Sequence, residues 1–328
     1  MTDSQPVPPV QPAQPVHRSG FACLVGRPNV GKSTLTNALV GDKVAIMSAR
    51  PQTTRHTIRG IVHRPDAQLI LVDTPGLHRP RTLLGQRLND LVKDTLGEVD
   101  VIAFCLPADQ KIGPGDRFIA EQLAPLMVGR RAKPVVAVVT KSDLVPRADL
   151  AQHLIAADQL ARSLDVEWAA IVPVSAIGGY QVDELEKVLT GFLPEGPELY
   201  PGGELTDEPE EVMIAELVRE AALEGVRDEL PHSLAVVVDE ILEKPGKPTG
   251  PDGNPGKPML TVHVSIYVER DSQKAIIIGR GGSRIREVGT QARQGIERLL
   301  GAKVYLDLHV KVAKDWQRDP KQLKKLGF

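Results

Sequence analysis

The residues best suited to chemistry are GRPNVGKS, at positions 26 to 33, which fit the pattern GxxxxGK[ST]. This segment follows an apolar run and precedes a helical pattern, the context that a phosphate-binding loop requires. Backbone N–H groups of such a loop turn toward phosphates, while the next helix offers its positive end. We expect Lys32 to reach the outer phosphates and the Ser33 hydroxyl to ligate magnesium. The predicted phosphate site comprises Gly26, Arg27, Pro28, Asn29, Val30, Gly31, Lys32 and Ser33.

A second motif, DTPG, follows the apolar run QLILV, so that a carboxylate emerges where parallel sheets bind their ligands. Asp73 can hold the magnesium shell, and the Gly76 N–H can sense a γ-phosphate. Alone, DxxG also fits an ordinary turn. After a phosphate loop it indicates a nucleotide switch, with a predicted site comprising Asp73, Thr74, Pro75, Gly76 and Leu77.

A third motif, TKSD, closes the apolar run PVVAVV. The Asp143 carboxylate can accept hydrogen bonds from guanine N1–H and the exocyclic amine, which adenine cannot offer together. A helix N-cap at Ser142 or Asp143 is the alternative for this tetrapeptide alone. VSA then ends another predicted strand, where a backbone N–H can reach the guanine oxygen. The predicted base site comprises Thr140, Lys141, Ser142, Asp143, Ser175 and Ala176.

The sequence IIIGRGGSRI contains a GxxG loop between two apolar helical runs. A loop without bulk lets a nucleic-acid backbone approach closely, as in KH domains, although a helix–turn–helix hairpin also fits. Charge favours the first interpretation, because residues 270–328 carry a net charge of +8 and residues 207–269 carry −9. The predicted RNA site comprises Gly279, Arg280, Gly281, Gly282, Arg284 and Arg286.

Alternating apolar and amphipathic segments must position the first three motifs. FACLVG, IRGIVH, QLILVD, VDVIAFCLP, PVVAVVT and AAIVPVS indicate strands, with helices such as 83–97 and 115–127 between them. This alternation predicts a mostly parallel α/β sheet with helices on both faces. It ends in a stretch rich in Pro, Gly and acidic residues, beyond which a small α+β unit follows. We expect a disordered Pro-rich tail at 1–19, domains at 20–193 and 209–328, and a linker at 194–208.

The bulk composition fits this division, since 328 residues exceed what one core usually organises. The net charge of −2 argues against a surface built throughout for nucleic acid or anionic membrane. Cys23 and Cys105 lie in apolar runs without metal-ligand spacing, and are expected to be reduced and buried. No run is long and apolar enough for a membrane span, so a cytoplasmic protein is expected.

In their order, these motifs resemble those of the translation-factor-related GTPases, and PQTTRH (51–56) resembles their magnesium-sensing switch. The resemblance implies GTP and GDP as ligands, with Mg²⁺ held by Ser33, Asp73 and Thr54, or by Thr53 in place of Thr54. Thr140 departs from the more frequent asparagine, which puts the usual tether to the phosphate loop in doubt.

Hydrolysis is implied to be slow, because Leu77 stands where Ras-like proteins carry a water-orienting glutamine. Asn29 resembles the potassium ligand of related GTPases, although a turn residue is the alternative. The residues assigned to catalysis are Lys32, Thr54, Gly76 and Asn29.

Over residues 20–328 the chain is similar to the Era family of ribosome-assembly GTPases, a GTPase domain followed by a type II KH domain. The similarity extends to LPEGPELYP with LTDEP in the linker, to IIIGRGGSRI and to the ending LKKLGF. It implies binding near the 3′ end of 16S rRNA, a role in maturation of the 30S subunit, and peripheral association with the inner membrane. We expect a monomer. The tail and the loop at 244–258 are additions to the family pattern.

Other functions fit parts of the chain. One is an RNA-binding module whose nucleotide is structural and never turns over, and another is a membrane-recruited regulator, supported by the basic segment 311–325. A tRNA-modifying GTPase would need a one-carbon or flavin-partner domain, and the second domain, which has no cysteine, shows no sign of one. An intact magnesium and γ-phosphate set favours a timing enzyme. Because one chain carries a switch and an RNA clamp, we expect the two sites to be coupled.

Overall fold

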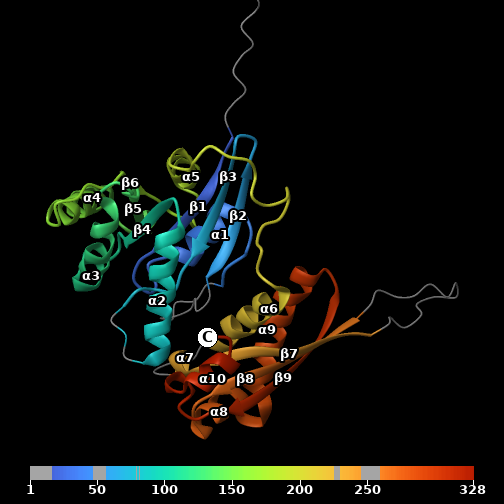
Figure 1. Cartoon of the computed structure of the whole chain (residues 1–328). Coiled ribbons are helices and arrows are strands. Elements are labelled where there is room, and N and C mark those ends of the chain that lie inside the picture. Colours follow the sequence, from blue (N-terminus) through green and yellow to red (C-terminus); the bar gives the residue numbers. More distant parts are fainter. Residues whose placement is uncertain (1–16, 47–56, 79, 81, 225–229, 245–258) are drawn as a thin grey trace, which may run out of the picture.

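The computed structural model describes residues 17–46, 57–78, 80, 82–224, 230–244 and 259–328. The larger, N-terminal domain is built on a six-stranded sheet of order β2-β3-β1-β4-β5-β6 (Figure 1). Only the edge strand β2 runs antiparallel to its neighbour in this sheet. The strands are β1 (Arg18–Val25), β2 (Ile58–Arg64), β3 (Ala67–Asp73), β4 (Val101–Pro107), β5 (Val135–Thr140) and β6 (Ala170–Pro173).

Helices cover both faces of this sheet, as the alternation of segments predicted. One face carries α1 (Lys32–Val40) and α5 (Val182–Gly191). The other carries α2 (Leu83–Glu98), α3 (Pro114–Leu123) and α4 (Arg147–Arg162). Short 3₁₀ turns, η1 (Ala124–Met127) and η2 (Ser142–Leu144), follow α3 and β5. The predicted α/β fold is confirmed, and continuous apolar runs form its strands because both sheet faces are buried.

The start of β1 at Arg18 places two residues of the expected tail in the sheet. Residues 18–24 pair with β3, so the first domain begins before the predicted position 20. The Arg18 guanidinium donates to the Leu193 carbonyl at 2.6 Å, which fixes this end of the chain beside the domain's last residues. Residues 1–16 of the expected tail lie outside the described residues.

The predicted linker lies along the first domain instead of spanning open solvent. Gln68 holds it by donating to the Tyr200 carbonyl at 2.8 Å. The Ile61 N–H donates to the Leu205 carbonyl at 2.8 Å, and Arg59 pairs with Asp207 at 2.8 Å. Both side chains of this ion pair are partly exposed. The hydrogen bond to the Asp207 carboxylate raises the pKa of the Arg59 guanidinium. The chain therefore leaves the first domain only after Asp207.

The second domain is the predicted small α+β unit. Its sheet has the order β7-β8-β9, with β7 and β8 antiparallel and β8 and β9 parallel. Helices α6, α8 and α9 share one apolar core with the sheet. The strands are β7 (Ala235–Lys244), β8 (Met259–Val268) and β9 (Lys303–Val312). The helices are α6 (Glu210–Leu223), α7 (Leu230–Ser233), α8 (Asp271–Ile278), η3 (Arg280–Gly282), α9 (Ser283–Leu300), η4 (Trp316–Arg318) and α10 (Pro320–Lys325).

Candidate functional site

The predicted phosphate loop joins the buried end of β1 to the first turn of α1. Gly26 lies so close to the β4 backbone that an added Cβ would stand 2.8 Å from the Cys105 carbonyl oxygen. Asn29 and Gly31 both have positive φ, at 65° and 100°, which turns the backbone sharply before the helix. This sequence of conformations brings N–H groups and the helix N-terminus to one place, as phosphate binding requires.

Lys32 lies inside this loop and is only 6% exposed. Its Nζ donates to the carbonyls of Gly26 and Arg27 at 3.1 and 3.0 Å. Burial lowers the pKa of the Lys32 ammonium, and the negative charge of Asp73 partly offsets that effect. An anionic phosphate beside Lys32 would act in the same direction as Asp73 and favour the charged lysine.

The predicted magnesium ligands Ser33 and Asp73 are brought together from α1 and β3. The Ser33 hydroxyl donates to Asp73 Oδ2 at 2.7 Å. Two neighbouring ligands of an octahedral Mg²⁺ lie about 2.9 Å apart, from bonds of about 2.0–2.1 Å, so this pair fits one ion. Within the described residues no cluster of three or more His, Cys, Asp or Glu side chains could hold a metal. Few protein ligands are typical of magnesium that is also bound by nucleotide phosphates.

The DTPG segment packs directly on the phosphate loop. An added Cβ at Gly76 would lie 2.7 Å from the backbone nitrogen of Pro28, so only glycine fits this approach. The Leu77 N–H donates to the Gly26 carbonyl at 3.2 Å, and the Thr74 hydroxyl donates to the Leu24 carbonyl at 2.7 Å. A shift of the phosphate loop must therefore move this segment too.

Leu77 is 4% exposed and packs in the apolar core beneath α2 and α3. Its side chain can orient no water, in agreement with the prediction from sequence. The next residue, His78, is tied to α2, because Asn89 Nδ2 donates to the His78 carbonyl at 2.7 Å. No pattern in the sequence predicts this link between the switch segment and the helix.

The tether placed in doubt by Thr140 is present. The Thr140 hydroxyl donates to the Val30 carbonyl of the phosphate loop at 2.5 Å, and both residues are buried. Ser142 N–H donates to the Val174 carbonyl at 3.1 Å, which joins TKSD to the VSA segment. Lys141 has a positive φ of 57° and pairs with Asp109 at 3.2 Å, while Asp143 is exposed at the same sheet edge.

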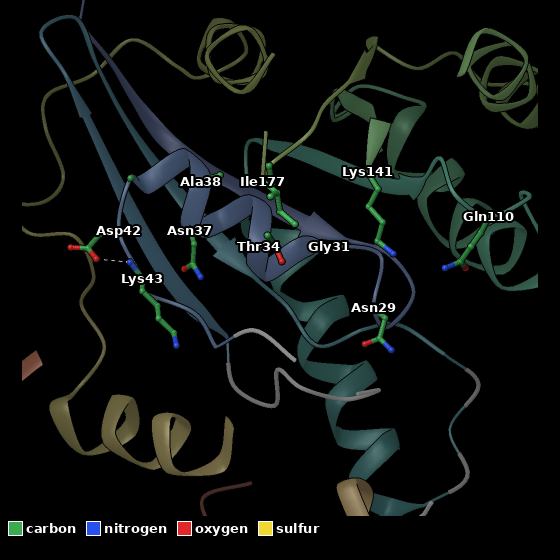
Figure 2. A pocket seen from close by; sticks show the side chains of 12 residues that line it. Asn29, Gly31, Thr34, Asn37, Ala38, Asp42, Lys43, Gln110, Lys141 and Ile177 are labelled. Carbon is green, nitrogen blue, oxygen red and sulfur yellow. Dashed lines mark hydrogen bonds between the residues drawn. The ribbon is translucent and has the colours of Figure 1, made fainter. Parts of the chain in front are cut away.

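The phosphate loop, α1 and the TKSD and VSA segments contribute residues to the lining of a cavity of about 880 Å³ (Figure 2). Four predicted residues line it, namely Asn29, Gly31, Lys141 and Ala176. The cavity is also lined by residues that were not predicted, among them Thr34, Asn37, Lys43, Gln110 and Ile177. Ile177 is 87% exposed, an unusual position for a large aliphatic side chain, and its place directly after VSA is the signal that could have revealed it.

Thr53 and Thr54, with the rest of PQTTRH, lie outside the described residues. The same holds for the loop at 245–258. Asn29 has a positive φ of 65°, a turn conformation that asparagine tolerates, and it lines the cavity. Its role as a potassium ligand stays a prediction.

The predicted GxxG segment forms the turn between α8 and α9. Gly279 has φ 72° and ψ 172°, and an added Cβ would lie 2.7 Å from Arg284 Cβ, so the turn requires glycine. Gly281 and Gly282 also have positive φ. Ile277 beneath the turn is fully buried, which anchors α8 to the sheet.

The three predicted arginines point in different ways. Arg280 is exposed on the turn. Arg286 Nη2 donates to the Gly281 carbonyl at 2.8 Å and supports the turn from outside. Arg284 lies against α6, where it donates to the carbonyl of Ala221 in the last turn of that helix and to the carbonyl of Glu224, the residue that follows the helix. The structure thus presents Arg280 and Arg286 near the glycines and uses Arg284 to hold α6.

Comparisons with known proteins agree with both domains. A model of the 50S ribosome-binding GTPase family matches residues 21–141, and a KH domain model matches residues 229–317. GTPase Era of Streptomyces coelicolor is 67% identical over 318 residues, 97% of each chain. GTPase Era of a Nocardioides species is 64% identical over 315 residues, 96% of this chain and 97% of that one.

Two solved structures share the whole architecture. Era in complex with MgGDPNP and nucleotides 1506–1542 of 16S ribosomal RNA has a TM-score of 0.84 and 39% identity, covering 95% of this chain and 99% of that one. A variant of Aquifex aeolicus Era bound to GDP·AlF₄⁻ has a TM-score of 0.82 and 38% identity, over 94% and 99% of the chains. Among the described residues, no helix is both long and apolar enough to cross a membrane.

Proposed function

This chain belongs to the GTPase Era family, and on that premise we propose that it hydrolyses GTP, binds 16S rRNA near its 3′ end and acts in assembly of the 30S subunit. One observation carries the proposal. Residues of the phosphate loop, of TKSD and of VSA line one cavity, and the Ser33–Asp73 pair lies where that loop enters α1, in a chain that also bears a glycine turn of KH type. The solved Era complex with MgGDPNP and 16S rRNA supports the same pair of ligands.

In the nucleotide site, residues 26–33 bind the phosphates through backbone N–H groups, and Lys32 pairs with the outer phosphates. Ser33 and Asp73 hold Mg²⁺, which supplies charge neutralisation between the phosphates. Gly76, packed against the phosphate loop, senses the γ-phosphate. Thr54 completes the switch in the GTP state.

Guanine is selected by the Asp143 carboxylate, with backbone N–H groups of Ser175 and Ala176 toward the guanine oxygen. The aliphatic stem of Lys141 and the Ile177 side chain line the cavity and provide apolar surface for the two faces of the base. Asp109 holds the Lys141 ammonium to one side, which leaves the stem extended along the cavity wall.

Intrinsic hydrolysis is slow because the Leu77 side chain is in the core and cannot orient the attacking water. A partner or a cation that supplies the missing charge can accelerate such a reaction by about 10³ to 10⁵-fold. Asn29 is the proposed potassium ligand, since its side chain lines the cavity beside the phosphate loop.

The RNA site is the turn at 279–282, with Arg280 and Arg286 toward phosphates or bases. Glycines at positive φ leave the turn without bulk, so an RNA backbone can approach as it does in KH domains. The proposed division of the chain is a GTPase domain at 18–193, a linker at 194–208 and an RNA-binding domain at 209–328. We place the protein in the cytoplasm as a monomer. We also propose that it associates peripherally with the inner membrane.

The function is tested by measuring turnover and bound RNA together. Purified protein with Mg²⁺ is expected to convert many equivalents of GTP to GDP and none of ATP, and crosslinking in cells is expected to recover the 3′ end of 16S rRNA. Recovery of that RNA with a nucleotide that is bound but never turned over would instead support an RNA-binding module with a structural nucleotide. Crosslinks to membrane lipid alone would support the recruited regulator.

A further inference from the structure

The C-terminal segment 313–328 lies between the two domains and belongs to the core of neither. Trp316 and Leu323 in this segment are fully buried, and the rings of Trp316 and Phe328 stack with centroids 5.6 Å apart. They share an apolar cluster with Leu84 and Leu88 of the GTPase domain's helix α2. Of the apolar clusters formed by the described residues, this one alone draws side chains from both domains.

Polar contacts fix the segment on both sides. Toward the GTPase domain, Arg87 Nη1 on α2 donates to the Phe328 carbonyl at 2.6 Å. Toward the RNA-binding domain, the Trp316 indole N–H donates to the Ser233 carbonyl, just before β7, at 3.0 Å. Ala235 of β7 and Tyr267 of β8 complete the cluster on that side. The segment therefore bridges α2 and the sheet of the RNA-binding domain.

Helix α2 is also bound to the nucleotide switch. Its apolar stripe continues from Leu84 and Leu88 to Val92 and Leu96, which pack on the sheet of the GTPase domain. Between these halves, Asn89 donates to the carbonyl of His78, two residues beyond Gly76. A displacement of the DTPG segment thus acts directly on the helix that holds the C-terminal segment.

The covalent connection between the domains is short. The linker is fixed to the GTPase domain up to Asp207, and α6 begins at Glu210, so the connection limits the angles between the domains while the contacts between them select one arrangement. An ion pair between the two domains, Lys43 with Glu220 at 2.5 Å, is partly exposed and contributes little to the stability of their docking. The buried cluster around Trp316 is the larger contribution to docking.

We propose that residues 313–328 are a lock that holds the RNA-binding domain on the switch helix α2 and is released or re-formed as the nucleotide state moves that helix. This inference deepens the proposed function, since it names the element through which GTP regulates RNA binding. Without the lock, the two sites are tethered but independent. With it, a coupling of about 5 to 150-fold between GTP and RNA affinities is expected.

The double variant Leu84→Ala/Leu88→Ala tests the lock from the GTPase side, where neither residue belongs to that domain's own apolar core. Leu160→Ala is the matched control, because Leu160 has the same exposure as Leu88 but lies in that core. RNA affinity is measured for a 16S 3′ fragment with GDP and with a non-hydrolysable GTP analogue. The ratio of the two affinities is expected to fall toward one in the double variant and to stay at the wild-type value in the control.

Trp316 supplies a second measurement, because only one other tryptophan, Trp168, is present. In a Trp168→Phe background, exchange of GDP for the GTP analogue is expected to shift the emission of Trp316, and the double variant is expected to show no shift.

An unchanged affinity ratio in the double variant would overturn the lock, as would a wild-type ratio of one or a Trp316 emission that is the same in both states. Failure of the wild-type protein to bind the RNA fragment in either state would count instead against the proposed function.

Discussion

Replacement of Thr140 by valine removes one hydroxyl and leaves the side-chain volume nearly unchanged. That hydroxyl donates to the Val30 carbonyl of the phosphate loop at 2.5 Å. Thr140 is 3% exposed and Val30 is 1% exposed, so water cannot replace the lost donor without local opening. The change therefore isolates the tether between the base-recognition segment and the phosphate loop.

A buried acceptor that loses its donor costs about 1–3 kcal/mol. Part of this cost lowers the free energy of unfolding, and part appears as weaker nucleotide binding, because GDP must order a loop that is no longer held in place. If about half of it, 0.5–1.5 kcal/mol, appears in binding, the Kd for GDP rises by roughly 2 to 13-fold. The remainder appears as a lower midpoint in urea.

The assay is titration and displacement of a fluorescent GDP analogue, with urea unfolding of the same preparations. Thr140→Ser retains the hydroxyl and is expected to bind GDP nearly as the wild type does. Thr140→Asn restores the residue more frequent in related GTPases and is expected to bind as well. Wild-type affinity and stability in Thr140→Val would refute the tether, and equal losses in the Ser and Val variants would assign the effect to packing.

Four further results follow from the same sites. Asp143→Asn should weaken GTP and favour xanthosine triphosphate in competition binding, whereas equal ATP and GTP affinities in the wild type would contradict the base assignment. Turnover should fall when sodium replaces potassium, and Asn29→Ala should remove that difference; rates indifferent to the cation in both proteins would exclude the ion. Gly279→Ala should reduce RNA affinity by about 5 to 150-fold, the range set by about 1–3 kcal/mol of backbone strain, without changing GDP affinity; unchanged RNA affinity would show that the turn is not the site. Burial raises the pKa of Cys105 to about 12, so thiol reagents at pH 8 should label the protein only after unfolding, and rapid labelling of the native protein would contradict the packing.

Regular patterns in the sequence predicted the fold well. The run KVYLDLHVKV became β9 over the full predicted length, because alternating apolar residues face the core on one side only. The runs of the first domain became strands buried on both faces, as their lack of alternation indicated. The phosphate loop was predictable because glycine, lysine and serine at fixed spacing satisfy a local geometry.

Contacts between distant segments were not predictable in this way. The tether by Thr140 depends on β5 ending beside the phosphate loop, a tertiary fact that the tetrapeptide does not contain. Arg284 was predicted to face RNA, yet it lies where the last carbonyls of α6 need a donor. The linker looked irregular because it forms few hydrogen bonds with itself, and its partners are on the first domain.

The most direct test of a GTP-controlled RNA-binding protein is the affinity of the full chain for a 16S 3′ fragment at fixed salt, with GDP and with a non-hydrolysable GTP analogue. Gly282→Asp is the control, since it places bulk and negative charge on the glycine turn and should abolish RNA binding while GDP still binds. We predict tighter RNA binding in the GTP state, by about 5 to 150-fold, and an equal increase of GTP-analogue affinity when RNA is bound. Identical RNA affinities in the two nucleotide states would contradict the account.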